Sequence, residues 1–264
     1  MLINVVLCQL KIGAGISLAE KIHIFKRKPD LLCLPEYFLM PENSSDYSLF
    51  ASRYRENLKH LSRLSNELNT TLIGGTIIEK SGEDKYNTSY VFKQGTKIAS
   101  YRKRHPTENE KRMGIRPGSR SIVFSVNGVR VGILICADAL DNGCFQKMQK
   151  MNADIIFIPT VSPLRKDDNP AQKARRDQDI FVEGARTAGA YIVKTCGIGS
   201  IFEHRLNGRS LVASPWGILW QIPSPHEQLP YIHNTLLDID ELREFKHAAL
   251  ISEVLNSSSN QNYN

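Results

Sequence analysis

Apolar runs that stop at a single reactive side chain are the feature that most constrains the fold of this chain. Residues 31–35 (LLCLP) lead into Glu36, residues 97–102 (KIASYR) into Lys103, and residues 129–135 (VRVGILI) into Cys136. Runs of this kind are typical of sheet strands. In open α/β proteins, ligands bind just beyond the carboxyl ends of such strands. The pattern therefore predicts that a carboxylate, an ammonium group and a thiol meet at one edge of a sheet.

The rest of the chain alternates between strand-like and helix-like segments. Strands are predicted for residues 2–10, 30–35, 71–79, 154–159, 190–195 and 231–239, and hairpins for residues 86–101, 121–135 and 209–222. Helices are predicted for residues 18–28, 53–69, 144–151, 171–188 and 240–249. Buried strands with intervening helices and hairpins favour an α/β fold with two mixed sheets packed face to face. Helices on both outer faces would complete a four-layer α-β-β-α sandwich.

Length and composition favour one large domain. The chain has 264 residues, of which 41% are hydrophobic and 23% charged, enough for a full core. We expect a single domain over residues 1–255, because no linker divides them, and a frayed tail over residues 256–264 (NSSSNQNYN). No apolar stretch approaches the roughly 20 residues that cross a bilayer. The N-terminus lacks the basic region of a signal peptide. We therefore expect a cytoplasmic protein without membrane contact.

The formal net charge of +7 is concentrated in two basic stretches, residues 101–120 and residues 165–176. One interpretation is that these are solvated loops and helix faces. The other is a basic rim that favours acidic substrates. Nucleic acid is not an expected partner, because the basic residues are not interleaved with a stacking set of aromatics. The first stretch contains Arg102, Lys103, Arg104, Lys111, Arg112, Arg116 and Arg120.

Cys136 differs from the other cysteines in its surroundings. The total of five cysteines is odd and includes no CxxC pair, which argues against a disulfide framework and a zinc ribbon. Gly132 lies inside the run before Cys136, where glycine often marks a close approach of another group. Ala137 begins a strand-to-helix turn, so its backbone N–H beside the thiol can face an oxyanion. The remaining cysteines are expected to pack in the core: Cys8, Cys33, Cys144 and Cys196.

Two carboxylates and one lysine are weaker signals when each is taken alone. A carboxylate after a buried strand is often at the surface, but Pro35 suits a strand end, and burial there would raise the pKa of Glu36 towards that of a general base. Lys103 alone is most simply a solvated lysine. Glu110 alone is a loop carboxylate or one near a helix N-terminus.

Taken together, these segments resemble the nitrilase superfamily of carbon–nitrogen hydrolases over nearly the whole chain. The resemblance implies an α-β-β-α sandwich with a Glu–Lys–Cys triad: Glu36 as general base, Lys103 as oxyanion-stabilising lysine and Cys136 as nucleophile. Glu110 is similar in place to the family's supporting glutamate. No metal or organic cofactor is implied, and a homo-oligomer is expected. The matching segments are residues 30–36, 86–92, 101–105, 116–118, 131–138, 153–159, 190–193 and 208–217.

The resemblance leaves the substrate open. Ala137-Asp138 after the cysteine looks like the amidase and carbamoylase branches, whereas residues 106–110 (PTENE) lean towards the nitrilase branch. We expect a cysteine hydrolase of a small amide or N-carbamoyl compound, which works through a thioester. The alternatives are a nitrilase that acts on a small nitrile and a catalytically idle scaffold on the same fold. The basic stretch from Arg102 to Arg120 suggests a carboxylate-bearing substrate.

Overall fold

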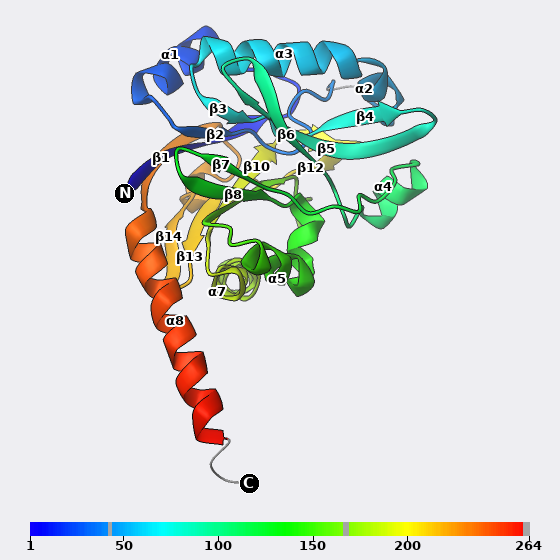
Figure 1. The fold of residues 1–264 in the computed structure, drawn as a ribbon. Helices are drawn as coiled ribbons and strands as arrows, with labels where there is room; N and C mark the ends of the chain where they lie inside the picture. The colour runs from blue at the N-terminus through cyan, green and yellow to red at the C-terminus, as the bar shows by residue number, and fades with distance from the viewer. Residues whose placement is uncertain (42–43, 166–168, 261–264) are drawn as a thin grey trace.

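The computed structural model describes residues 1–41, 44–165 and 169–260, and within them thirteen strands pair into one strongly curled sheet. The two halves of this sheet face each other (Figure 1). They join where β1 (Leu2–Lys11) and β10 (Tyr191–Ile198) run parallel, with Leu10 opposite Gly197 and Lys11 opposite Ile198. The halves therefore form two inner layers that share an edge.

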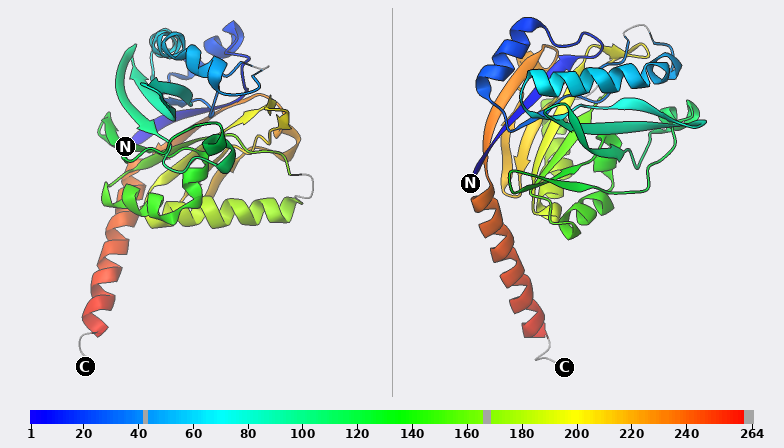
Figure 2. Two further views of the ribbon diagram at one scale, coloured as in Figure 1. Left: turned by 90° about the vertical axis from the view of Figure 1, so that its right-hand side faces the viewer. Right: turned by 45° about the horizontal axis from the view of Figure 1, so that its top comes forward.

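The first half of the sheet is built on β1 and has parallel strands at its centre and antiparallel strands at its edges. Helices α1 (Leu18–Arg27) and α3 (Tyr54–Glu67) cover its outer face, and the short α2 (Ser48–Ser52) precedes α3 (Figures 1 and 2). The other strands of this half are β2 (Leu31–Cys33), β3 (Thr71–Ile73), β4 (Ile77–Ser81), β5 (Asp84–Lys93), β6 (Thr96–Arg102) and β15 (Tyr231–Asp238).

The second half is built on β10 and is covered by α5 (Asn142–Lys150) and α7 (Glu183–Ala188). A π-helical turn, η2 (Gln178–Val182), connects α7 to the preceding α6 (Pro170–Asp177). The other strands of this half are β7 (Val123–Val126), β8 (Val129–Ile133), β9 (Ile155–Thr160), β13 (Leu211–Ser214) and β14 (Gly217–Gln221). The remaining short elements are α4 (Glu108–Arg112), η1 (Cys136–Leu140), β11 (Ser200–Ile201), β12 (His204–Arg205) and η3 (Ser224–His226).

Residues of β1 show how the layers pack. Successive side chains of a strand point to opposite faces. Val5 and Leu7 accordingly lie in the inner cluster, which fills the space between the two halves of the sheet. Val6 and Cys8 lie in the outer cluster, which also contains apolar residues of α1 and α3. The predicted four-layer α-β-β-α sandwich is confirmed, with the refinement that its two sheets are continuous at β1 and β10.

The strand predicted for residues 71–79 is wrong in one respect, because it is divided into β3 and β4. The break contains Gly75, which has a φ of +62°, a conformation that glycine adopts without strain. A Cβ on Gly75 would lie 2.0 Å from the carbonyl oxygen of Pro35. The break therefore lets the segment before Glu36 pass close to this backbone.

The C-terminal helix is longer than the sequence predicts. α8 (Ile239–Asn260) continues past Ala249, where the predicted helix ends, and its sequence contains no Gly or Pro to stop it. The first part of the predicted tail thus lies in this helix, and residues 261–264 lie outside the described residues. α8 extends away from the rest of the molecule (Figures 1 and 2). None of the helices in the described ranges is both long and apolar enough to cross a membrane.

Candidate active site

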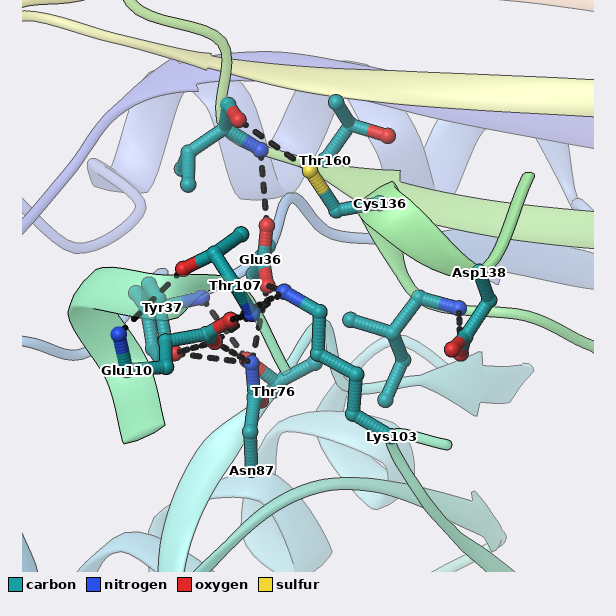
Figure 3. A network of polar contacts seen from close by, with 12 residues as sticks. Glu36, Tyr37, Thr76, Asn87, Lys103, Thr107, Glu110, Cys136, Asp138 and Thr160 are labelled. Carbon is teal, nitrogen blue, oxygen red and sulfur yellow. Dashed lines mark hydrogen bonds and ion pairs between the residues drawn. The ribbon is translucent and has the colours of Figure 1, made fainter. Parts of the chain in front are cut away.

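Three segments that are distant in sequence bring Glu36, Lys103 and Cys136 together beyond the ends of their strands. Glu36 follows β2, Lys103 follows β6, and Cys136 follows β8 at the start of η1. Glu36 is 0% and Lys103 1% exposed, whereas Cys136 is half-buried. Their side chains point towards one another (Figure 3). The other four cysteines are buried, as expected for packing residues.

Glu36 is held through both of its carboxylate oxygens. Its Oε1 accepts hydrogen bonds from Lys103 Nζ at 2.8 Å and from Asn87 Nδ2 at 2.8 Å. Its Oε2 accepts from the backbone N–H of Val161 at 2.9 Å. The backbone also turns sharply after Glu36, because Tyr37 has a φ of +56° and donates its N–H to Thr76 Oγ1. These contacts fix the carboxylate in one orientation.

Lys103 lies between two carboxylates. Besides Glu36, its Nζ contacts Oε1 and Oε2 of Glu110 at 3.0 and 2.8 Å. Glu110 lies in α4 and forms a capping box with Thr107, whose N–H donates to Glu110 Oε2 at 2.6 Å. Tyr37 donates its hydroxyl to Glu110 Oε1 as well. The structure therefore brings Glu110, 3% exposed, into the same buried network.

Cys136 lies at a strained turn. Its φ is +45°, an unusual conformation for a non-glycine residue, and such strain tends to occur at functional sites. Its Sγ contacts the carbonyl oxygen of Val161 at 3.2 Å. Since Val161 also donates its N–H to Glu36, one residue holds both the thiol and the carboxylate. Ala137, the next residue, borders the same cavity as Cys136.

Asp138 connects the Cys136 turn to the Lys103 segment. It is fully buried, and its Oδ2 accepts from Ile135 N at 2.9 Å and from the Tyr101 hydroxyl at 2.8 Å. Its Oδ1 accepts from Arg104 N at 3.0 Å and from His105 N at 2.7 Å. One carboxylate thus aligns the strand ends that carry the thiol and the ammonium group.

The pKa values of the two glutamates are shifted in opposite directions by their surroundings. Burial raises the pKa of Glu36 above its ordinary value, against the opposing effect of the Lys103 ammonium. For Glu110, burial is outweighed by the Lys103 charge and by hydrogen bonds, so its pKa is lowered. Burial opposes the charge of Lys103, but Glu36, Cys136 and Glu110 hold the pKa of Lys103 well above its usual range. Different pKa directions for neighbouring acids are typical of acid–base sites.

The surroundings of Cys136 disfavour its thiolate form. Burial, with the nearby Glu36 charge, raises the pKa of Cys136 well above its ordinary value, and Lys103 only partly opposes this. A thiol becomes a strong nucleophile only as the thiolate. Any chemistry at Cys136 therefore needs a base close by, and Glu36 is positioned near it by their shared contact with Val161.

Sequence reasoning missed three residues of this network. Asn87 Nδ2 lies within hydrogen-bond distance of Glu36, Tyr37 and Glu110, at 2.8, 2.8 and 2.9 Å. Asn87 carries no spacing signal, because its role depends on the strand pairing of β5. The role of Tyr37 depends on contacts with Thr76 and Glu110, which are 39 and 73 residues away in the sequence. Asp138 was noted only as a marker of substrate branch, although a carboxylate two residues after the thiol, in an apolar setting, was a usable signal.

Two cavities meet at Cys136. The first, of about 300 Å³, is bordered by Cys136, Ala137 and Phe181 and by charged residues: Arg165, Arg176, Asp177, Lys194 and Arg209. The second, of about 360 Å³, is bordered by the Glu36 network and by residues of β11, β12 and the turn between them. We call the first the Lys194 cavity. Its volume is at the lower end of the range for small-molecule sites, which suits a short substrate.

Another polar cluster lies beside the site. His105, Asp141 and Cys144 have potential metal-ligand atoms within 4.8 Å of one another. Asp141 caps α5 through Gly143 N at 2.9 Å and pairs with His105 Nε2 at 2.9 Å. These contacts account for the cluster without a metal ion.

Comparison with known proteins shows similarity over most of the chain. The carbon–nitrogen hydrolase family model matches residues 10–244. A glutamine-dependent NAD(+) synthetase of Acinetobacter baylyi is 22% identical over 223 residues, which cover 83% of this chain but only 40% of the synthetase. The 2-oxoglutaramate amidase of Bacillus subtilis is 24% identical over 191 residues, 71% of each protein.

The fold also matches solved structures. The carbon–nitrogen hydrolase of Helicobacter pylori G27 superimposes with a TM-score of 0.79 at 16% identity, covering 94% of this chain and 93% of that one. The family model spans all three segments that carry Glu36, Lys103 and Cys136. The resemblance to the nitrilase superfamily is confirmed, and the chain is an enzyme of the carbon–nitrogen hydrolase family.

Proposed function

We propose that this enzyme hydrolyses the C–N bond of a small amide or N-carbamoyl compound through a thioester on Cys136. The observation that carries the proposal is the shared contact with Val161: its N–H binds Glu36 and its carbonyl oxygen contacts the Cys136 thiol, while Lys103 donates to Glu36. A base, a nucleophile and a cation thereby border one point in space.

In the first step, Glu36 accepts the thiol proton as Cys136 attacks the amide carbon. Its raised pKa makes Glu36 a stronger base than an exposed glutamate. A C–S bond forms, and the carbonyl electron pair moves to the oxygen, which becomes an oxyanion. The thiol needs this base because its own pKa is raised by burial.

Lys103 and the backbone N–H of Ala137 stabilise the oxyanion. An ammonium group has three hydrogens to donate. In the resting site Glu36 accepts one hydrogen bond from Lys103 and the two oxygens of Glu110 accept two more, so the substrate oxygen takes over one of the Glu110 contacts. A single oxyanion donor of this kind is typically worth about 10²–10³ in rate. Glu110 holds Lys103 in place and keeps it charged.

The intermediate then collapses and is hydrolysed. The C–N bond breaks, and the leaving ammonia or amine takes the proton from Glu36, which leaves the acyl group on sulfur. Glu36 next takes a proton from water, whose oxygen attacks the thioester. The C–S bond breaks, the sulfur regains a proton from Glu36, and a carboxylic acid departs. Glu36 and Cys136 return to their starting states.

The test measures ammonia release from matched amides, N-carbamoyl compounds and nitriles. The wild type should hydrolyse amides or carbamoyl compounds, and Cys136→Ala should abolish turnover. Cys144→Ala is the matched control, because Cys144 is buried in α5 and lies outside both cavities.

Each alternative predicts a different outcome of this test. Turnover of nitriles alone would replace the amide substrate by a nitrile. Turnover that survives in Cys136→Ala would remove Cys136 from the mechanism. No turnover of any compound, with a Cys136 thiol no more reactive than free cysteine, would favour the idle scaffold. A homo-oligomer and independence from metal or organic cofactors remain predictions.

A further inference from the structure

The Lys194 cavity contains a buried cation whose hydrogen-bonding capacity is largely unused. Lys194 lies on β10 and is 5% exposed. The single polar contact of its side chain in the described part of the chain joins Nζ to Asp177 Oδ1 at 3.4 Å. This distance is longer than the roughly 2.7–2.9 Å of a good charge-assisted hydrogen bond. Its ammonium also lies 4.5 Å from the centre of the Phe181 ring. Burying a cation this way is costly without a better partner.

The surrounding ion network does not neutralise Lys194. Asp177 Oδ2 accepts hydrogen bonds from Arg209 and from Gln221. Arg209 also donates to Glu227 Oε1 at 2.6 Å, and Lys173 donates to Glu227 Oε2 at 2.8 Å. Three cations thus face two carboxylates within this network. Of these three cations, Lys194 and Arg209 line the cavity and Lys173 does not; Arg165 and Arg176 line it as well.

A second polar group in the cavity wall has no partner. Asn207 is 4% exposed, and its Oδ1 is buried without a hydrogen bond. The described residues provide no hydrogen bond to its side chain. A buried amide without a partner is rare in native proteins unless a ligand or water completes it. Oδ1 is an acceptor, but Nδ2 of the same amide also makes no hydrogen bond within the described residues, so Asn207 Nδ2 and Lys194 Nζ both have unused donor capacity on the cavity wall.

The strand pairing relates this wall to the nucleophile. Lys194 pairs with Ile158 of β9, and Ile133 of β8, three residues before Cys136, pairs with Phe157. Neighbouring strands are about 5 Å apart, so the backbones of β8 and β10 are separated by about 10 Å. Lys194 and Cys136 border the same cavity, which extends past the end of β9 at Thr160. A short chain with an amide at one end and an anion at the other spans this gap.

We propose that the substrate carries a carboxylate remote from its scissile C–N bond, and that Lys194 and Asn207 bind this carboxylate. This inference rests on the proposed function and specifies its substrate class. Lys194 Nζ and Asn207 Nδ2 donate to the carboxylate, which neutralises the excess charge of the network. None of the basic residues between Arg102 and Arg120 lines this cavity.

The test compares monoamides of short dicarboxylic acids (succinamate and glutaramate) with uncharged amides of equal length (butyramide and pentanamide). The wild type should favour the acidic amides. Lys194→Met should raise KM for the acidic amides by about 10- to 100-fold, the usual value of a hydrogen bond to a charged group. The kinetics of the uncharged amides should change far less, so the preference for acidic amides should be lost.

Lys173→Met is the matched control. Lys173 donates to Glu227 and Lys194 donates to Asp177, and Arg209 binds both of these carboxylates. Only Lys194 of the two lysines lines the cavity. Lys173→Met should leave both substrate classes unaffected. Equal wild-type turnover of acidic and uncharged amides, or an equal loss for both classes in Lys194→Met, would overturn the inference while leaving the proposed function intact.

If the wild type hydrolyses no amide, the proposed function fails, and calorimetry with glutarate still decides the inference. Binding of glutarate to the wild type and its loss in Lys194→Met would support the carboxylate site. An absence of binding to the wild type, or equal binding to Lys194→Met, would overturn it.

Discussion

Replacing Glu110 by Gln tests how the second carboxylate supports the site. The change keeps the shape of the side chain but removes the charge that binds Lys103 Nζ at 2.8 and 3.0 Å. Hydrogen bonds to charged groups are worth about 1.5–3 kcal/mol, so kcat/KM should fall by about 10- to 150-fold. The loss comes from a less well positioned Lys103.

The pH profile gives a sharper signature than the rate. The Glu36 and Glu110 carboxylates both accept from Asn87 Nδ2, at 2.8 and 2.9 Å, so their charges repel at close range. Two like charges about 5 Å apart repel by about 3 kcal/mol at an effective dielectric constant of 20. After burial, this repulsion helps to raise the pKa of Glu36. Without the Glu110 charge the pKa of Glu36 falls, and the acidic limb of kcat/KM moves to lower pH.

The assay records kcat/KM against pH for the wild type, Glu110→Gln and a control, Glu108→Gln. Glu108 lies in the same helix, but it is exposed and pairs with Lys111 rather than with Lys103. The control should keep the wild-type profile. An acidic limb that stays in place or moves to higher pH in Glu110→Gln would refute the reasoning, because Glu36 would not then be the base that the limb reports.

Two further substitutions test the scaffold of the site. Gly75→Ala should lower the free energy of unfolding by about 3 kcal/mol or more in urea titrations, because its Cβ would lie 2.0 Å from the carbonyl oxygen of Pro35. Gly82→Ala, which has a similar φ of +61° but open space around it, should cost only about 1–2 kcal/mol; equal losses would contradict the steric argument. Asp138→Asn should cost about 2–4 kcal/mol and slow the alkylation of Cys136 by iodoacetamide, since its four hydrogen bonds align the thiol turn. Asp141→Asn, on the exposed cap of α5, should leave that alkylation rate unchanged, and a matching loss there would refute the assignment.

The sequence predicted the layers and most elements because their signals are local. The nearly continuous apolar run of β1 and the spacing of the leucines of α3 depend only on neighbouring residues. The division of the strand over residues 71–79 was not predictable in the same way. It results from the approach of Pro35 to Gly75, a contact between segments about forty residues apart, and glycine alone does not reveal what lies opposite it.

The convergence of the reactive residues followed from strand ends, whereas their supporting shell did not. Parallel strands end at one edge of a sheet, so Glu36 and Cys136 could be placed together from their positions in the chain. Asn87 lies inside β5 and reaches the site through the pairing of β5 with β6, in which Thr88 is opposite Arg102. That register emerges only in the folded sheet.

The basic residues give the most general lesson. The hypothesis of a carboxylate-bearing substrate was based on the dense stretch from Arg102 to Arg120. In the structure, Arg102 pairs with Glu79 and Arg116 pairs with Asp84, and neither arginine lines the Lys194 cavity. Exposed cations are well solvated and cost the fold little free energy, so their number says little about where a ligand binds. Lys194 lies instead within β10, and all the remaining residues of this strand are buried too. A single charge that the chain keeps inside an apolar strand costs free energy unless something binds it, and for that reason it indicates a site more strongly than a run of exposed arginines.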